Sequence, residues 1–283
     1  MERCNEPQPP RILTIAGSDS GGGAGIEADL KTFTALGVYG MAAITSITAQ
    51  NTIEVTAVYD LPPDLVAEQI DVVIRDIGVD AAKTGMLSHA GIVEAVANAV
   101  ARNGIVKLVV DPVMLSKGGA TLLQNAAQAA IKERLMPLAF VATPNIPEAE
   151  ILSGLRIESV EDVREAAKRI AGLGARHVLI KGGHLEGPEA TDYWYDGDGF
   201  REFSAPRIET RNTHGTGCTY SAAIAAHLGM GLEMGEAVRR AKEYLSGAIE
   251  HSFALGKGHG PLNHFWLSCG VTQNGQARRD KVK

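Results

Sequence analysis

The sequence predicts an α/β protein with a central, mostly parallel sheet, flanked by helices on both faces, in a single domain. Short β-favouring runs alternate along the chain with segments whose apolar residues recur at helical spacing, the pattern of parallel strands joined by crossover helices. A length of 283 residues would allow two domains, but a large α/β sheet can hold such a chain as one. The chain contains no internal repeat and no Pro/Ser-rich linker, which favours one domain.

The N-terminal half reads as repeated strand, loop and helix units. A β-favouring run over 12–16 stops at Gly17, and a glycine-rich loop then leads into apolar residues at helical spacing. Gly37 ends that helix, and two prolines at 62–63 can open the next, because proline is tolerated in a first turn. The elements predicted here are strands at 12–16, 41–47, 79–84 and 106–110, and helices at 26–36, 62–76 and 89–102.

The same alternation continues through the C-terminal half. Its predicted elements are helices at 121–135, after 144–148, and at 160–173, 216–228 and 233–255, strands at 140–143 and 178–181, and a β-ribbon at 191–194 and 200–204. The division predicted is a flexible leader over 1–10, one folded domain over 11–267 and a flexible tail over 268–283.

Composition and charge narrow the function classes. The 27 Lys and Arg against 33 Asp and Glu give a net charge of −6, which argues against a nucleic-acid or membrane-surface binder. No apolar run reaches the ~18 residues of a membrane-spanning helix. Three sparse cysteines do not form a disulfide framework, which favours a reducing compartment. We therefore expect a cytoplasmic protein, and an anionic substrate would need a local binding device.

Polar residues follow four predicted strands: the 17–25 loop, Asp111, Asn145 to Glu148, and Lys181. Ligands in open α/β sheets bind beyond the carboxyl ends of strands, so these groups should meet at one site. Asp111, Glu148 and Asn145 could hold Mg²⁺, which takes few carboxylates and keeps most of its waters. Each acid also has a purely structural explanation, Glu148 in a helix first turn and Asp111 in a turn before proline.

Two glycine-rich segments favour an anionic ligand. The 17–25 loop matches neither the dinucleotide-binding nor the P-loop pattern, but three consecutive glycines exceed the needs of a tight turn. In the second segment, Gly215, Thr216 and Gly217 open a helix whose backbone N–H groups would cradle negative charge. Cys218 falls in that first turn, where the helix field is expected to lower a thiol pKa. The alternative for Cys218 is a small buried core residue.

Read together, these segments resemble the hydroxymethylpyrimidine/phosphomethylpyrimidine kinases of the ribokinase-like superfamily. The resemblance spans about residues 11–267. It is carried by the segments 16–26, 28–32, 49–52, 83–87, 111–114, 143–149, 181–184, 212–218 and 258–265.

The resemblance implies a ribokinase-like fold, a homodimer, and the use of ATP and Mg²⁺. The implied reaction phosphorylates 4-amino-5-hydroxymethyl-2-methylpyrimidine at its primary alcohol and then phosphorylates the monophosphate, in thiamine biosynthesis. Phosphoryl transfer depends mostly on positioning and charge neutralisation, so Cys218 can serve where sugar kinases of the superfamily place an aspartate base. Cys218 either deprotonates the alcohol or orients it.

The resemblance also implies roles for individual residues. Gln50 would pair with the ring nitrogen and amino group of the pyrimidine, since an amide offers both a donor and an acceptor. The implied sets are Ala24, Asp29, Met86 and Val113 with Gln50 for the acceptor; Lys181, Asn145, Thr213 and His214 for the nucleotide; Asp111 and Glu148 for magnesium; and Gly215, Thr216, Gly217 and Cys218 for catalysis. His214 alternatively only orients its loop.

Three other functions stay open at this point. A pyridoxal or pyridoxine kinase would use a similar ring and the same chemistry. A cysteine hydrolase would pair Cys218 with His214, although His214 precedes the predicted helix. A pyrimidine-binding sensor would need no catalysis, and the presence of Asp111, Asn145, Glu148 and Lys181 argues against it.

Overall fold

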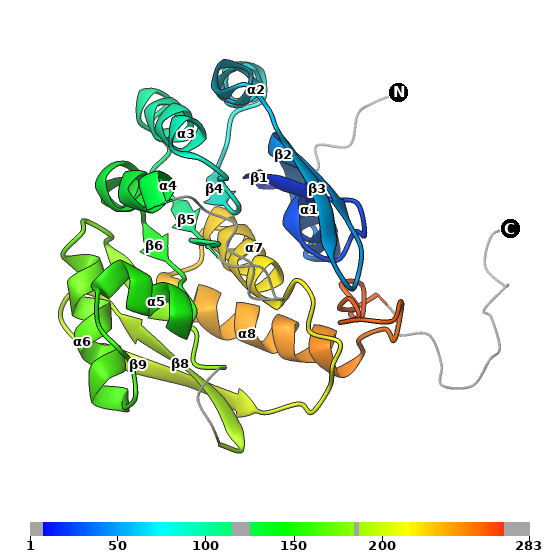
Figure 1. Cartoon of the computed structure of the whole chain (residues 1–283), viewed down its shortest axis with the longest axis vertical. Coiled ribbons are helices and arrows are strands. Elements are labelled where there is room, and N and C mark those ends of the chain that lie inside the picture. The colour runs from blue at the N-terminus through cyan, green and yellow to red at the C-terminus, as the bar shows by residue number, and fades with distance from the viewer. Residues whose placement is uncertain (1–7, 115–124, 184–186, 269–283) are drawn as a thin grey trace, which may run out of the picture.

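The computed structural model describes residues 8–114, 125–183 and 187–268 (Figure 1). Within these ranges nine strands form one sheet, in the order β3-β2-β1-β4-β5-β6-β7-β8-β9. The strands are β1 (Arg11–Asp19), β2 (Tyr39–Gln50), β3 (Val55–Asp60), β4 (Ala81–Thr84), β5 (Leu108–Val110), β6 (Val141–Ala142), β7 (His177–Ile180), β8 (Glu189–Tyr195) and β9 (Phe200–Pro206).

The sheet is parallel in its centre and antiparallel at both edges. From β2 through β1, β4, β5 and β6 to β7, each strand pairs in parallel with the next in the sheet. At the edges β3 pairs with β2, β8 with β7 and β9 with β8, all antiparallel. The parallel centre brings the carboxyl ends of β1, β2, β4, β5, β6 and β7 to one side of the sheet, which confirms the predicted class of fold.

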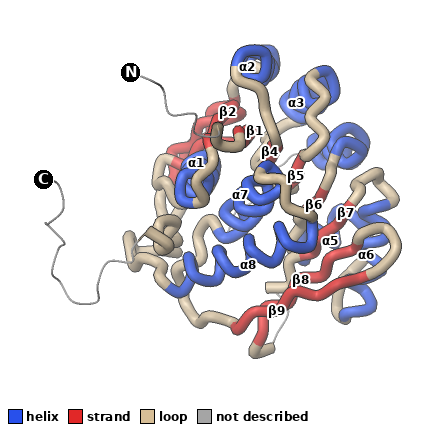
Figure 2. The backbone as a smooth tube through the Cα atoms, turned by 180° about the vertical axis from the view of Figure 1, so that it is seen from behind, coloured by secondary structure: helices blue, strands red, loops and turns tan. Residues whose placement is uncertain are grey.

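Helices cover both faces of the sheet, as the tube in Figure 2 also shows. One layer contains α2, α3, α4, α5 and α6, and α1, α7 and α8 form the other; Figure 1 shows α7 and α8 across the strands from α2 to α4. Their bounds are α1 (Gly25–Ala35), α2 (Pro63–Asp76), α3 (Ala90–Arg102), α4 (Asn125–Ala130), α5 (Ile146–Ser153), α6 (Val160–Ala171), α7 (Thr216–Gly229) and α8 (Met234–Glu250).

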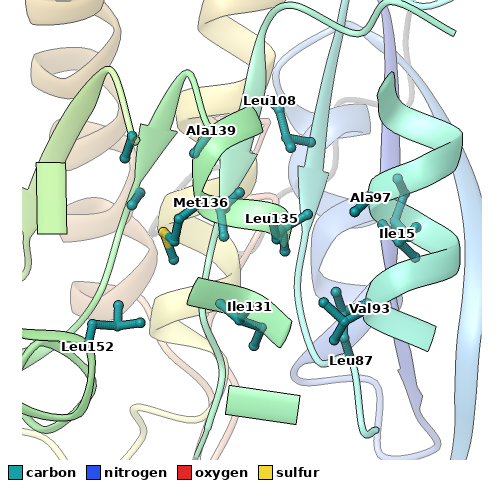
Figure 3. Packing of buried hydrophobic residues seen from close by; sticks show 14 of the residues in the cluster. Ile15, Leu87, Val93, Ala97, Leu108, Ile131, Leu135, Met136, Ala139 and Leu152 are labelled. Atoms are coloured by element: carbon teal, nitrogen blue, oxygen red, sulfur yellow. The ribbon is translucent and has the colours of Figure 1, made fainter. Parts of the chain in front are cut away.

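Strand alternation divides the core between the two layers. Leu13 and Ile15 of β1 pack into the layer of α2 to α6, whereas Ile12 packs into the layer of α1, α7 and α8. Successive side chains of a strand point to opposite faces, so a sheet buried on both faces reads as a continuous apolar run. Figure 3 shows part of the first layer, where Ile15 of β1 lies near Ala97 of α3.

The prediction and the structure differ at three elements. The strand β3 was not predicted, because most of its residues are exposed and it lacks a buried run. The predicted 121–135 helix begins outside the described residues, and its described part is α4 followed by a π-helical turn over 131–135. The helix α8 ends at Glu250 instead of 255, because the chain turns back and the Phe253 N–H donates to the Pro261 carbonyl. Most of the predicted leader and tail lies outside the described residues.

Candidate active site

A cavity of about 720 Å³ opens where the parallel strands end. Its wall combines the loop after β1, the ends of β2 and β4, the segments after β5, β6 and β7, and the start of α7. The residues predicted for the site that line it are Ala24, Gln50, Met86, Asp111, Val113, Asn145, Glu148, Lys181, Thr213, His214, Gly215, Thr216, Gly217 and Cys218. One predicted residue, Asp29, is not part of this wall.

The loop after β1 is held closed by the carboxylate of Asp19. Its oxygens accept hydrogen bonds from the backbone N–H groups of Gly21, Gly23 and Ala24, at 2.8–3.0 Å. Gly25 begins α1 with φ +58°, and a Cβ there would lie 2.4 Å from the Gly17 carbonyl oxygen. A side chain at Gly25 would therefore force the loop apart.

The second glycine segment places the start of α7 against that loop. Gly215 has φ +82°, and a Cβ there would lie 1.8 Å from the carbonyl oxygen of Gly23, so only glycine fits. Within the described chain no side chain caps α7, and Thr216, Gly217 and Cys218 of its first turn line the cavity. Uncapped N–H groups at a helix start form a site for anionic oxygen.

Asp111, Lys181 and Glu148 form a charged cluster at the ends of β5, β6 and β7. Lys181 Nζ donates to Asp111 Oδ1 at 2.7 Å, and Ser221 Oγ donates to Asp111 Oδ2 at 3.1 Å. Burial alone would raise the pKa of Asp111, but Lys181 and Lys83 outweigh it and the net shift is downward. Asp111 is therefore a carboxylate at neutral pH.

The pKa of Glu148 is raised, whereas that of Asp111 is lowered. It closes a capping box on α5, in which its Oε2 accepts from the Asn145 N–H at 2.8 Å and Asn145 Oδ1 accepts from the Glu148 N–H at 2.9 Å. Burial, and to a smaller extent the charge of Asp111, raise the pKa of Glu148 to about 7, against the attraction of Lys181. The structural role of Glu148 in the first turn and a role at the cavity thus coexist.

Cys218 contradicts one expectation. The helix field was expected to lower the pKa of its thiol, but burial raises that pKa to about 11, although Lys83 and the Gly25 N–H oppose the shift. The free-energy cost of moving a thiolate out of water is larger than the stabilisation by the partial charges at the starts of α1 and α7. At neutral pH the free protein therefore carries Cys218 as a thiol.

Cys218 and His214 do not fit the catalytic pair of a cysteine hydrolase. His214 Nε2 lies 2.8 Å from Asp19 Oδ2, and this ring nitrogen is therefore committed to Asp19. A cysteine nucleophile needs a lowered thiol pKa beside a base, whereas burial raises the pKa of Cys218.

Asp29 was predicted to contact the acceptor, but it does not line the cavity. Its carboxylate is fully buried in α1, where it accepts two hydrogen bonds from Lys83 Nζ, at 2.8 and 3.0 Å, and one from Thr14 Oγ1, at 2.6 Å. A direct contact with an acceptor is therefore a wrong prediction for this geometry. Asp29 is the counterion of a buried lysine, and Lys83 in turn acts electrostatically on Cys218 and Asp111.

A further buried cluster was missed at the far end of the cavity. Asp192 of β8 accepts from Lys242 Nζ at 2.6 Å, from Tyr220 Oη at 2.9 Å and from the Gly182 N–H at 3.1 Å. An acid inside an alternating strand predicts a solvent-facing side chain, so the sequence carried no signal for it. Apolar side chains of α8, among them Leu245, line the cavity beside this cluster.

Comparisons with known proteins agree with this geometry. The family model for phosphomethylpyrimidine kinase matches residues 19–263. The chain belongs to this family. It is 48% identical to the hydroxymethylpyrimidine/phosphomethylpyrimidine kinase of Bacillus subtilis, over 90% of this chain and 94% of that protein. The resemblance read from the sequence is thereby confirmed.

Two further relatives complete the comparison. The chain is 53% identical to a thiamine biosynthesis bifunctional protein of Geobacter sulfurreducens over 89% of this chain, and it spans about half, 52%, of that longer protein. The solved ADP complex of Bacillus subtilis pyridoxal kinase superimposes with a TM-score of 0.87 at 43% identity, covering 93% of this chain and all of that one. The predicted ribokinase-like, single-domain fold is confirmed.

Within the described residues, none of the helices is both long and apolar enough to span a membrane.

Proposed function

We propose that this kinase transfers the γ-phosphoryl group of ATP to 4-amino-5-hydroxymethyl-2-methylpyrimidine and then to the resulting monophosphate, in thiamine biosynthesis. The family and the names of its relatives support this reaction. The observation that carries it is the position of the 213–218 segment. A Cβ on Gly215 would touch the Gly23 carbonyl, and one on Gly217 would lie 3.4 Å from Lys181 Nζ. One backbone cradle therefore joins both ends of the cavity.

The order of the strands supports our assignment of the two ends of the cavity. Gln50 closes β2 on one side of β1, whereas Lys181 follows β7 on the other side of the sheet. We place the acceptor at the first end, where Ala24, Met86 and Val113 also line the wall. The nucleotide takes the second end, near Lys181, with Asn145 and Thr213 beside it.

The chemistry then follows from the groups between the two ends. The acceptor oxygen attacks the γ-phosphorus, the bond from that phosphorus to the β–γ bridging oxygen breaks, and ADP leaves. The N–H groups of Gly215 to Cys218 and the ammonium of Lys181 face the charge that develops on the transferred oxygens. In the first reaction the alcohol proton must be accepted, and the thiolate form of Cys218, a minor species at neutral pH, is the candidate base on the cradle. In the second reaction the acceptor is already an anion and needs no base.

Asp111 and Glu148 fit Mg²⁺ as the accompanying ion. They are hard oxygen donors, both buried, and the charge of Asp111 contributes to the pKa of about 7 at Glu148. A nearby divalent cation favours the ionised form of Glu148, so the ion and these two acids complement each other. When bound, Mg²⁺ would neutralise phosphate charge. The side chain of Asn145 stays in the capping box and is occupied there.

Glu148→Gln is expected to raise the Mg²⁺ concentration for half-maximal turnover by ~10-fold or more, because one of two buried carboxylates is lost. The fold should persist, since the new amide oxygen can still accept the Asn145 N–H. Turnover should be titrated with Mg²⁺ at fixed ATP, with the thermal unfolding midpoint as the control. An unchanged Mg²⁺ titration would remove Glu148 from the metal site.

We also propose a homodimer formed through the β3 edge of the sheet. Ile47 of β2 and Tyr59 of β3 are directly opposite in the register, and 50% and 68% of their surfaces are exposed. Val58 and Ile53 add further exposed apolar surface around this edge. Neighbouring exposed apolar side chains on an edge hairpin are typical of an interface with a second chain.

Sedimentation of the wild type is expected to give twice the 29.9 kDa chain mass, and Tyr59→Glu should shift it toward one chain mass. A charge in an apolar interface leaves an unpaired, desolvated group in the dimer only. Val106→Glu is a matched control, because Val106 is 73% exposed and lies far from this edge in the strand order. A wild type that sediments as one chain at micromolar concentration excludes the dimer.

The substrate is tested by a coupled ADP-release assay with the aminopyrimidine alcohol and pyridoxal side by side. The likeness to a pyridoxal kinase keeps that second activity under test. We expect a higher kcat/KM for the aminopyrimidine. A higher value for pyridoxal would replace the proposed substrate.

We also propose that the protein is located in the cytoplasm, because its cysteines are sparse.

A further inference from the structure

Asp192 of β8 is a buried carboxylate to which the proposed reaction assigns no role. Donors from three different elements converge on its side chain. Oδ2 accepts hydrogen bonds from Lys242 Nζ of α8 at 2.6 Å and from Tyr220 Oη of α7 at 2.9 Å. Oδ1 accepts from the backbone N–H of Gly182, just after β7, at 3.1 Å. One carboxylate therefore ties two helices to the end of a central strand.

The contact with Gly182 lies where the chain leaves the sheet. The antiparallel register of β7 and β8 ends with Ile180 opposite Tyr193, and two residues later the Gly182 N–H donates to the side chain of Asp192. A Cβ on Gly182 would lie 1.7 Å from the Thr191 carbonyl oxygen, so only glycine lets the chain approach β8 this closely. Asp192 thus anchors the peptide group that follows the last residue of the cavity end of β7.

Lys181 lies directly before this anchored peptide group. Its own N–H donates to the Pro144 carbonyl at 2.8 Å, and its Nζ donates to Asp111 Oδ1 at 2.7 Å. The backbone of Lys181 is therefore held from both sides, by Pro144 at its own N–H and by Asp192 at the next one. A lysine side chain is a long, flexible stem, so a fixed backbone restricts the positions that its ammonium can reach.

We propose that Asp192 is a positioning residue for phosphoryl transfer, which acts on Lys181 through the Gly182 N–H. Asp192 holds the peptide group between Lys181 and Gly182, and thereby keeps the Lys181 ammonium at Asp111 beside the transferred phosphoryl group. The role rests on the proposed function, in which the nucleotide phosphates lie near Lys181. A displacement of about 1 Å in a group that contacts the reacting atoms can slow a reaction by up to ~10²-fold.

Lys242 and Tyr220 keep Asp192 in the form that this role requires. A buried carboxylate without a partner is unfavourable, and the ammonium of Lys242 supplies the opposite charge. Burial raises the pKa of Tyr220 well above its usual range, so its hydroxyl keeps its proton and donates to Asp192. Because these two donors occupy Oδ2, Oδ1 stays directed at Gly182.

Two double variants isolate the contact with Gly182. Asp192→Asn with Lys242→Met, and Asp192→Leu with Lys242→Met, both remove the buried ion pair, so neither leaves an unpaired charge. Asparagine and leucine have nearly the same shape, but only asparagine offers an oxygen to the Gly182 N–H. Lys242 lines the cavity, and since it is absent from both variants, any contact of its ammonium with the nucleotide cancels in the comparison.

The first measurement is kcat for the aminopyrimidine alcohol at saturating ATP. We expect it to be ~10-fold or more lower in the Leu double variant than in the Asn double variant. The calorimetric affinity for the alcohol, measured without ATP, should agree between the two within ~2-fold, because the acceptor takes the other end of the cavity. A merely structural role would not confine the loss to kcat. The thermal unfolding midpoint checks that both proteins are folded.

The second measurement adds Lys181→Ala to both double variants. If Asp192 acts through Lys181, the tenfold ratio of kcat between the Asn and Leu proteins should fall to within ~2-fold, because two changes that act through one group are not additive. If the Leu double variant does not fold, Asp192→Ala with Lys242→Met takes its place. Tyr220→Phe measures separately what the loss of the hydroxyl contact alone does to kcat.

The outcomes separate this role from the proposed function. Equal kcat values in the Asn and Leu variants overturn the role of Asp192, and so does a ratio that persists after Lys181→Ala. A loss in Tyr220→Phe as large as that in the Leu variant assigns the effect to the hydroxyl and overturns it too. A wild type that phosphorylates pyridoxal but not the aminopyrimidine overturns the proposed substrate alone, and the same comparison is then made with pyridoxal. A wild type that phosphorylates neither overturns both.

Discussion

Lys83→Met is expected to lower the free energy of unfolding by ~3–5 kcal/mol, the usual cost of removing one partner of a buried ion pair. Lys83 and Asp29 are both fully buried, and Nζ lies 2.8 Å from Oδ2. Burial alone would lower the pKa of Lys83, but Asp29 outweighs it and the net shift is upward. Burial raises the pKa of Asp29 and outweighs the attraction of Lys83. In the variant, Asp29 keeps only the hydrogen bond from Thr14, so it must either hold an unpaired charge in the apolar layer or take up a proton, and both are unfavourable.

The matched control is the double variant Lys83→Met with Asp29→Leu. Both charges are then replaced by apolar groups of similar size, and such replacements of buried pairs are often neutral or stabilising. Urea denaturation of wild type, single and double variants should show most of the loss recovered in the double variant. A single variant within ~1 kcal/mol of wild type, or a double variant as unstable as the single one, would contradict a buried, charged pair.

The ion pair between Lys83 and Asp29 could not be predicted from the sequence. The strands and their order of appearance were predictable, because buried parallel strands leave continuous apolar runs and glycines mark their ends. A lysine between Ala82 and Thr84 of a short strand carries no such signal. Its partner Asp29 is 54 residues away in sequence, and only the packing of α1 against β1 and β4 brings the two together.

The candidate site was predictable to a greater degree, for a topological reason. In a parallel sheet the residues that follow successive strands must gather at one edge, so Asp111, Asn145 and Lys181 line one cavity as expected. The contacts among the loops were not predictable. The pairing of Asp19 with His214 depends on two glycines, Gly23 and Gly215, that let backbone segments approach within side-chain distance.

Electrostatic environment was the least predictable property. The position of Cys218 in a helix first turn predicts a lowered thiol pKa. Lys83 and the Gly25 N–H do act in that direction. The sequence does not reveal that the thiol lies half-buried in the cavity wall, where burial has a larger effect on its pKa than the helix start. With its pKa raised, the Cys218 thiol must lose its own proton before it can accept one from the alcohol.

Cys218→Ser is expected to slow phosphorylation of the alcohol by ~10²-fold, in the range of general-base effects, and phosphorylation of the monophosphate much less. Serine keeps the backbone cradle of Gly215 to Cys218 but has a hydroxyl that ionises far less readily than the thiol. Only the first acceptor is a neutral alcohol that must lose a proton. The two steps should be measured separately, each with its own purified acceptor, in wild type and variant.

The pH dependence adds a second readout with a definite sign. Burial raises the pKa of the Cys218 thiol to about 11, so below this value the thiolate fraction rises about tenfold per pH unit. If the thiolate accepts the alcohol proton, the first step in wild type should accelerate with pH between 7 and 9, and Cys218→Ser should lose this slope. The second step should not show it in either protein. Equal losses in the two steps, or parallel pH profiles, would mean that Cys218 orients the acceptor through the cradle and that the alcohol proton leaves by another route.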